Sequence, residues 1–228
     1  MKVIFLGKNP TVGNCKGIDA LQYLIDNDIE VVRVVASENN LQKYSLSKNL
    51  VVKKENELYT EISEGKLNNI DLVISYGFPN LIKSPLITLG KRGCINFHPA
   101  PLPEWRGMGG VFNIGLYEKV LKWGVTCHYV DDNFDTGDII KINSFKVDPK
   151  NNTLFDFTKK CQLETLNLFK EIISLFLSGE NIPKIPQQKG RYISKKYFNK
   201  VKNINLDDSV EEIDNKKDAQ AKQSLLNR

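Results

Sequence analysis

Residues 95–107 read INFHPAPLPEWRG, and they form the junction between a predicted strand and a proline-rich loop. The strand, residues 93–97, is short and apolar. Asn96 and His98 stand at its end, and prolines stiffen the loop that follows as far as Arg106. His98 is one of only two histidines in the chain. This loop is therefore the first candidate for a functional site.

A second stretch holds the other histidine, His128, and an Asp-Thr-Gly sequence at residues 135–137. Residues 123–130 alternate with period two, which predicts a strand, and residues 138–147 predict a returning strand. The acidic turn between them carries Asp135. If this hairpin lies beside the strand that carries His98, the Asp135 carboxylate can face that histidine.

Upstream of these two stretches, predicted strands and helices alternate. Strands are expected at 2–6, 30–37, 51–52, 71–75 and 93–97. Helices are expected at 17–27 and 57–67, with a short helix or irregular piece at 41–50 and a short helix ending near 89. The pattern predicts an α/β fold: a Rossmann-like, mostly parallel sheet flanked by helices. Ligands bind at the carboxyl ends of such strands. The Tyr76–Asn80 loop should therefore share one rim with Asn96 and His98.

The second half of the chain predicts a helix at 108–118 and a long amphipathic helix at 153–177, capped by Asn152 or Thr153. The apolar stripe of the long helix is wide, which indicates core packing and leaves room for a dimer contact. Beyond it the composition turns basic and aromatic, and then polar. We therefore expect a domain at 1–180 and a small, partly irregular C-terminal extension at 181–228.

Composition narrows the function classes. With 228 residues, 41% hydrophobic content and a net charge of +5, the chain is an ordinary globular protein, too weakly basic to predict a nucleic-acid partner. Its four cysteines form no C-x-x-C pair, so no metal site is expected. Without a signal peptide or an apolar segment long enough to span a bilayer, we expect a cytoplasmic protein with no membrane partner.

The loop after the first strand matches neither the dinucleotide-binding nor the ATP-binding glycine pattern. A plain strand-to-helix connection is the simplest interpretation of that loop. Lys8 and Asn9 within it are candidate contacts for an anionic ligand.

Asn96, His98 and Asp135 together suit acyl transfer. An aspartate can hold a histidine in one tautomer and stabilise its protonated form, and an asparagine amide can donate to a developing oxyanion. The chain has no G-x-S-x-G nucleophile, and Cys127 has no catalytic context, so the substrate would supply the nucleophile. Singly, each of the three residues has an ordinary structural alternative. His128, inside a strand, suits packing or hydrogen bonding better than catalysis.

Residues 96–107 resemble the signature of the 10-formyltetrahydrofolate-dependent formyltransferases: an N-x-H, a proline-rich loop and then R-G. The second stretch is also similar to that family, from Gly124 through His128 to the D-x-G at 135–137. The resemblance covers residues 1–180. It implies the formyltransferase fold, 10-formyltetrahydrofolate as cosubstrate, and Asn96, His98 and Asp135 as catalytic residues. It assigns folate binding to Tyr76, Gly77, Phe78, Pro79, Asn80 and Asp131.

The sequence HPAPLPEWRGMGG at residues 98–110 looks most like the corresponding stretch of the nucleotide-sugar N-formyltransferases. That resemblance implies formylation of a dTDP-linked amino sugar, first of all dTDP-4-amino-4,6-dideoxyglucose, for O-antigen or other surface glycan synthesis, by a homodimer. Substrate contacts are then expected from Arg106, Gly107, Met108, Lys8, Asn9, Tyr192 and Lys195. Arg106 has an alternative, which is to tie down its own loop.

Other readings of the same residues stay open. Glycinamide ribonucleotide and methionyl-tRNA are alternative acceptors, although the about fifty residues after the long helix are few for a second barrel domain. An alternative of another class is a non-catalytic regulator that binds folate or a nucleotide on the same fold.

Overall fold

The structure, a computed structural model, describes residues 1–9, 16–107, 110–203 and 208–224, with side chains up to residue 218. Within them one six-stranded sheet has the order β2-β1-β3-β4-β5-β6. The strands are β1 (Lys2–Gly7), β2 (Glu30–Ala36), β3 (Leu72–Tyr76), β4 (Cys94–His98), β5 (Lys122–Tyr129) and β6 (Ile139–Lys146). The pairs among β1 to β4 are parallel, and those from β4 to β6 are antiparallel. The predicted mostly parallel α/β fold is confirmed.

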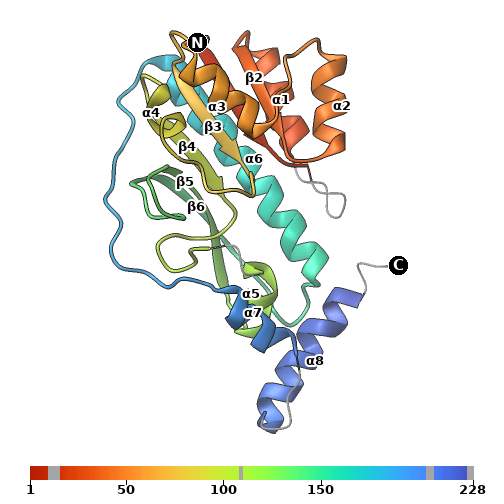
Figure 1. Cartoon of the computed structure of the whole chain (residues 1–228). Helices are drawn as coiled ribbons and strands as arrows, with labels where there is room; N and C mark the ends of the chain where they lie inside the picture. Colours follow the sequence, from red (N-terminus) through yellow and green to blue (C-terminus); the bar gives the residue numbers. More distant parts are fainter. Residues whose placement is uncertain (10–15, 108–109, 204–207, 225–228) are drawn as a thin grey trace.

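Helices cover both faces of this sheet (Figure 1). They are α1 (Gly17–Asp26), α2 (Asn39–Ser47), α3 (Glu55–Ser63), α4 (Leu86–Leu89), α5 (Val111–Tyr117), α6 (Leu154–Ser178), α7 (Lys195–Lys202) and α8 (Val210–Ser224). No helix in the described ranges is long and apolar enough to cross a membrane.

The two faces of the sheet have separate cores because successive strand side chains point to opposite sides. On β1, Val3 and Phe5 join the larger core with α1, α5 and α6, while Ile4 and Leu6 join the smaller one with α3 and α4. All four are completely buried. The apolar runs that predict buried strands thus serve both layers at once.

The predicted strand at 51–52 is wrong: Val52 makes only an isolated bridge to Val34. Two residues supply too few ladder hydrogen bonds for a strand of their own. The long helix is confirmed, with Thr153 as its N-cap. The Thr153 side chain accepts from the backbone N–H of Asp156, and the Asp156 carboxylate accepts from the backbone N–H of Thr153. Gly179, at φ +75°, ends it.

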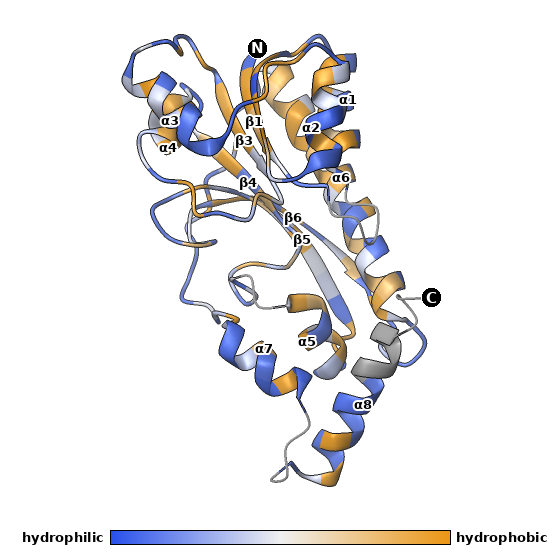
Figure 2. Ribbon diagram, turned by 45° about the vertical axis from the view of Figure 1, so that its right-hand side comes forward, coloured by the Kyte–Doolittle hydropathy of each residue, from blue (hydrophilic) through white to orange (hydrophobic). Residues whose placement is uncertain are grey.

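The C-terminal extension begins with an irregular segment that bridges Ile185 to Ile139 on β6 and Tyr192 to Arg106. It ends in α7 and α8, two helices that the sequence analysis does not predict. Figure 2 shows why, since their coloured turns are mostly hydrophilic. On α8, Lys216 is fully buried and donates to Asp208 at 2.5 Å. Asp208 lies two residues before α8, so this ion pair is internal to the segment and leaves no apolar stripe in the sequence.

Candidate active site

Asn96 and His98, at the end of β4, lie beside Asp135, in the loop between β5 and β6. His98 Nδ1 is 3.5 Å from Asp135 Oδ1, and both residues are buried. They meet because the β5–β6 hairpin pairs with β4, as the sequence analysis anticipates. The structure therefore brings together the three groups that the sequence assigns to catalysis.

Strand register sets the orientation of the Asn96 amide. Ser75, Asn96 and His128 lie opposite one another on β3, β4 and β5. The Ser75 hydroxyl donates to Asn96 Oδ1 at 2.7 Å, and Asn96 Nδ2 lies 3.1 Å from His128 Nε2. His128 Nδ1 is 2.7 Å from the Tyr129 carbonyl, so Nδ1 carries the hydrogen and Nε2 accepts from Asn96. Within the described ranges no partner is found for the second Asn96 amide hydrogen. His128 has the hydrogen-bonding role predicted for it.

The His98 ring is held in one tautomer. Its Nε2 lies 2.7 Å from the carbonyl oxygen of Trp105. A carbonyl only accepts hydrogen bonds, so Nε2 carries the hydrogen, and Nδ1 is the nitrogen that can take up a proton. Burial lowers the pKa of His98 from its usual value, although the Asp135 carboxylate works in the opposite direction. At neutral pH the ring is therefore a neutral base that faces a carboxylate.

Asp135 is kept ionised by its surroundings. Burial by itself would raise the pKa of this carboxyl, but the positive charge of the imidazolium forms of His98 and His128, together with the Gly107 N–H, outweighs burial and holds the pKa well below its usual range. Asp135 Oδ2 accepts from the Gly107 N–H at 2.8 Å. The residue itself has φ +57°, a left-handed conformation that aspartate tolerates better than most residues.

We expect Asp135→Asn to lower the pKa of His98 further, because it removes the negative charge that favours the imidazolium. With only two histidines in the chain, the imidazole signals in an NMR pH titration can be assigned by comparison with a His128→Gln variant. Asp138→Asn, which removes a carboxylate from the same loop, is the control. A His98 midpoint that stays unchanged or rises in Asp135→Asn would contradict the electrostatic assignment.

A cavity of about 360 Å³ opens beside these groups. Asn96, His98 and Asp135 line it, together with Lys8, Gly107 and all five residues of the predicted folate-binding loop, Tyr76, Gly77, Phe78, Pro79 and Asn80. Gly77 adopts φ +66° where this loop leaves β3. The rim predicted from the strand ends is thus a single concave surface.

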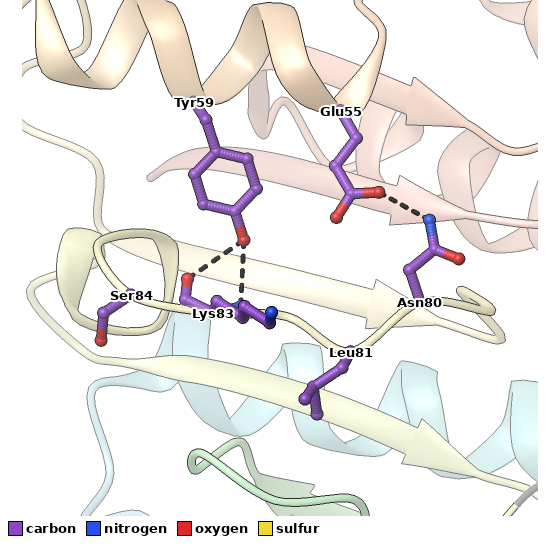
Figure 3. A pocket seen from close by; sticks show the side chains of 6 residues that line it. All are labelled: Glu55, Tyr59, Asn80, Leu81, Lys83 and Ser84. Carbon is purple, nitrogen blue, oxygen red and sulfur yellow. Dashed lines mark hydrogen bonds between the residues drawn. The ribbon is translucent and has the colours of Figure 1, made fainter.

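The predicted folate-binding loop and the residues that follow it to Lys83 are tied to α3 (Figure 3). The Tyr59 hydroxyl donates to the Lys83 carbonyl at 3.1 Å and accepts from the Lys83 N–H at 2.9 Å. Glu55 accepts from the Asn80 amide at 2.6 Å. The side chain of Asn80 is therefore used to fix its own loop, even though the residue also lines the cavity.

Several predicted contacts are not among the residues that line the cavity. Asp131 caps the Asp135 loop, where its carboxylate accepts from the Asn133 N–H at 3.2 Å and from the Thr136 hydroxyl at 2.6 Å. Asn9 Oδ1 accepts from the Ile18 N–H at 3.4 Å. Met108 lies outside the described residues. For Asp131 and Asn9, the structure offers a local structural role, and their ligand contacts remain predictions.

Arg106 has the alternative role considered above, which is to tie down its own loop. Its guanidinium donates to the Gln187 side chain and to the Gln188 carbonyl. Tyr192 and Lys195 are exposed on the C-terminal extension, with Tyr192 beside Gly107. These positions are fixed by how the extension folds back on the domain. No pattern within residues 95–107 reveals such a long-range contact.

Among the site residues that were not predicted from the sequence, two glutamines stand out. Gln187 contacts both catalytic loops, and Gln162 on α6 lines the cavity. Gln162 Oε1 is buried and has no hydrogen-bond partner among the described residues. A buried unpaired acceptor is costly, so a ligand N–H or O–H is its natural partner. A single glutamine within an amphipathic helix gives no signal of such a role.

The neighbouring cysteine does not add a nucleophile. Cys127 is completely buried, and burial raises the pKa of its thiol well above the usual value. Among the described residues, no group of three His, Cys, Asp or Glu side chains is placed to hold a metal ion. That the substrate supplies the nucleophile stays a prediction from the sequence.

The fold and these groups define a group-transfer enzyme with an α/β sheet and an Asn-His-Asp site. The family model described as formyl transferase matches residues 9–173, well over half of the chain. The chain therefore belongs to the formyl transferase family and is an enzyme of that class.

Some similar proteins are named as methionyl-tRNA formyltransferases and others as sugar or 4-N formyltransferases. Methionyl-tRNA formyltransferase of Clostridioides difficile is 27% identical over 94% of this chain, which spans 72% of that protein. The sugar 3N-formyl transferase WlaRD, solved in the presence of dTDP and 5-N-formyl-THF, is 25% identical, with a TM-score of 0.76 over 99% of this chain and 81% of that one. A 4-N formyltransferase from Francisella tularensis has the same fold, at 24% identity and a TM-score of 0.73, over 95% of this chain and 87% of that one.

Proposed function

We propose that the chain transfers the formyl group of 10-formyltetrahydrofolate to the amine of a dTDP-linked amino-dideoxy sugar. The first candidate acceptor is dTDP-4-amino-4,6-dideoxyglucose, for O-antigen or other surface glycan synthesis, with a homodimer as the working assembly. One observation carries the proposal: Asn96, His98 and Asp135 line the same cavity as the Tyr76–Asn80 loop. Acyl-transfer groups and a candidate folate wall thus face one space.

The size and the lining of the cavity support a folate cosubstrate. Its volume of about 360 Å³ falls within the range of ligand sites, roughly 300–1,000 Å³. Phe78, Pro79, Leu81 and Ile82 supply an apolar wall for a flat ring system. The cosubstrate brings the formyl group, and the loop after β3 would hold its ring.

The chemistry assigned to the chain begins with a neutral amine that attacks the formyl carbon. As the new C–N bond forms, the free hydrogen of the Asn96 amide donates to the oxygen that gains negative charge. His98 takes the amine proton at Nδ1, and Asp135 stabilises the resulting imidazolium. His98 can then return that proton to the folate nitrogen as its bond to the formyl carbon breaks. Atoms and charges balance without a covalent enzyme intermediate.

The likeness to the sugar 3N-formyl transferase supports a sugar acceptor because it spans 99% of this chain, the C-terminal extension included. Methionyl-tRNA is the second candidate, favoured by the 27% identity to the C. difficile enzyme. Against it stands the net charge of +5, since tRNA binding draws on many phosphate contacts.

A panel assay separates these candidates. The protein is incubated with 10-formyltetrahydrofolate and, in turn, with 3- and 4-amino dTDP-sugars, glycinamide ribonucleotide and methionyl-tRNA, while the release of tetrahydrofolate is followed. We expect turnover with a dTDP-amino sugar. Turnover with methionyl-tRNA alone would overturn the sugar acceptor, and turnover with none of them would favour the non-catalytic regulator.

We expect Gln162→Leu to raise the KM of one of the two substrates by up to about tenfold, the worth of one hydrogen bond at the cavity. The physical reason is that a donor group of the ligand loses the Gln162 amide oxygen as its acceptor. Gln162→Glu keeps an acceptor of the same length and should restore a KM near that of the wild type. Equal KM values for Gln162→Leu and wild type would show that this oxygen contacts neither substrate.

A further inference from the structure

A segment of the C-terminal extension lies across both catalytic loops. We call Gln187–Ile193 the strap. Its backbone pairs with the end of the proline-rich loop: the Arg106 N–H donates to the Arg191 carbonyl at 3.1 Å, and the Ile193 N–H donates to the Arg106 carbonyl at 2.7 Å. At Gly190 the contact is so close that a Cβ would lie 1.9 Å from the Pro103 carbonyl oxygen.

Within the strap, the Gln187 side chain connects the two loops directly. Its Oε1 accepts from Arg106 Nε at 3.2 Å and from Arg106 Nη2 at 2.9 Å. Its Nε2 donates to the carbonyls of Asp135 at 3.2 Å and Gly137 at 2.6 Å. One amide thus joins the loop that follows His98 to the loop that carries Asp135.

This link bears on the distance between His98 and Asp135. Asp135 is held at two points: the Gly107 N–H binds its carboxylate at 2.8 Å, and Gln187 binds its carbonyl. Both hydrogen bonds depend on Arg106 and Gly107, because Gly107 donates one of them and Arg106 binds the Gln187 side chain that donates the other. The left-handed φ of Asp135, +57°, is a conformation that such ties must maintain.

We propose that Gln187 and Arg106 form a positioning pair for formyl transfer, which holds the Asp135 carboxylate against His98. The inference rests on the proposed function for its catalytic consequence. It proposes that Arg106 helps to position Asp135 for the reaction, in place of the substrate contact predicted from the sequence. Neither residue touches the reacting atoms, because both act through the Asp135 loop.

The strap has anchors apart from Gln187, which makes a clean test feasible. Arg191 pairs with both carboxylate oxygens of Glu118 at 2.9 and 3.0 Å, and its guanidinium lies 4.3 Å from the centre of the Trp105 ring. Ile193 is buried. Removal of the Gln187 side chain should therefore leave the strap in place and release only the link between the loops.

The first arm of the test is kinetic. Gln187→Ala and Arg106→Ala should each lower kcat by about 10- to 100-fold, with the KM of both substrates nearly unchanged, because small displacements at a catalytic site have effects of that size. Gln187→Glu keeps the acceptor for Arg106 but loses the donor to Asp135, so it should stay impaired. Gln188→Ala removes an exposed side chain but keeps the backbone carbonyl that accepts from Arg106, so it should match the wild type.

The second arm does not depend on turnover. In an NMR titration, the His98 midpoint in Gln187→Ala should move in the same direction as in Asp135→Asn, while Gln188→Ala leaves it in place. A wild-type midpoint and wild-type kcat in Gln187→Ala, or an Arg106→Ala variant that raises only the acceptor KM, would overturn the positioning role. If the wild type turns over no acceptor, the proposed function fails, and the His98 titration still decides whether the link holds Asp135.

Discussion

His98→Ala should lower kcat by about 10²–10⁴-fold, the usual contribution of a positioned general acid–base group. The reason is the fixed tautomer: with Nε2 committed to the Trp105 carbonyl, Nδ1 is the one ring nitrogen able to receive the amine proton. Single-turnover kinetics with saturating folate and acceptor measure the loss at the chemical step. The KM of each substrate should change little.

The role of His98 also predicts how the rate depends on pH. Activity requires neutral His98, and burial lowers its pKa, so the wild-type rate should persist to lower pH than an ordinary histidine would allow. The lowered pKa also means that the unfolded chain binds this proton more readily. The stability of the fold with a neutral, buried His98 ring is therefore complete above the usual histidine pKa. It declines as the pH falls, because the unfolded chain then takes up the proton more readily than the folded one. A His98→Ala rate near that of the wild type would remove His98 from the mechanism.

The second large effect is expected for Asn96→Ala, about 10²–10³-fold in kcat, as for the loss of one oxyanion donor. Ser75 and His128 hold the amide in one orientation, which fixes the direction of its remaining hydrogen before a substrate binds. Asn96→Asp is the sharper variant, because it keeps the size of the side chain and replaces the donor by a carboxylate.

Ser75→Ala serves as the matched comparison for this prediction. It removes only the hydrogen bond that fixes Asn96 Oδ1 and should cost less than Asn96→Ala does. If Ser75→Ala and Asn96→Ala had equal effects, orientation of the amide would account for the whole loss. If Asn96→Ala retained wild-type kcat, the oxyanion assignment would be wrong.

The elements that could be predicted from the sequence are those with a local pattern of apolar and polar residues. Apolar runs of strand length marked β1, β2, β3 and β4, and the period-two stretch before Asp135 marked the hairpin. Since parallel strands share one carboxyl edge, the common rim of Tyr76 and His98 followed from the pattern alone. The chemistry of Asn, His and Asp then identified the catalytic candidates.

The contacts that escaped prediction depend on register or on distant chain segments. The hydrogen bond from Ser75 to Asn96 exists only because β3 and β4 pair in one particular register. Gln187 reaches the catalytic loops across 52 positions of sequence from Asp135. On α8 the buried Lys216 is paired with Asp208, and such a polar pair leaves no apolar periodicity. Such features are determined by tertiary structure, which periodicity does not encode.

The alignment of Ser75, Asn96 and His128 on three neighbouring strands constrains how the gene can vary. One residue inserted into β5 ahead of His128 would turn that ring to the opposite face of the sheet and leave the Asn96 amide without its acceptor. Loops at the surface accept length changes far more easily. Along β5, therefore, a single codon gained or lost should be as damaging to the enzyme as the substitution of a catalytic residue.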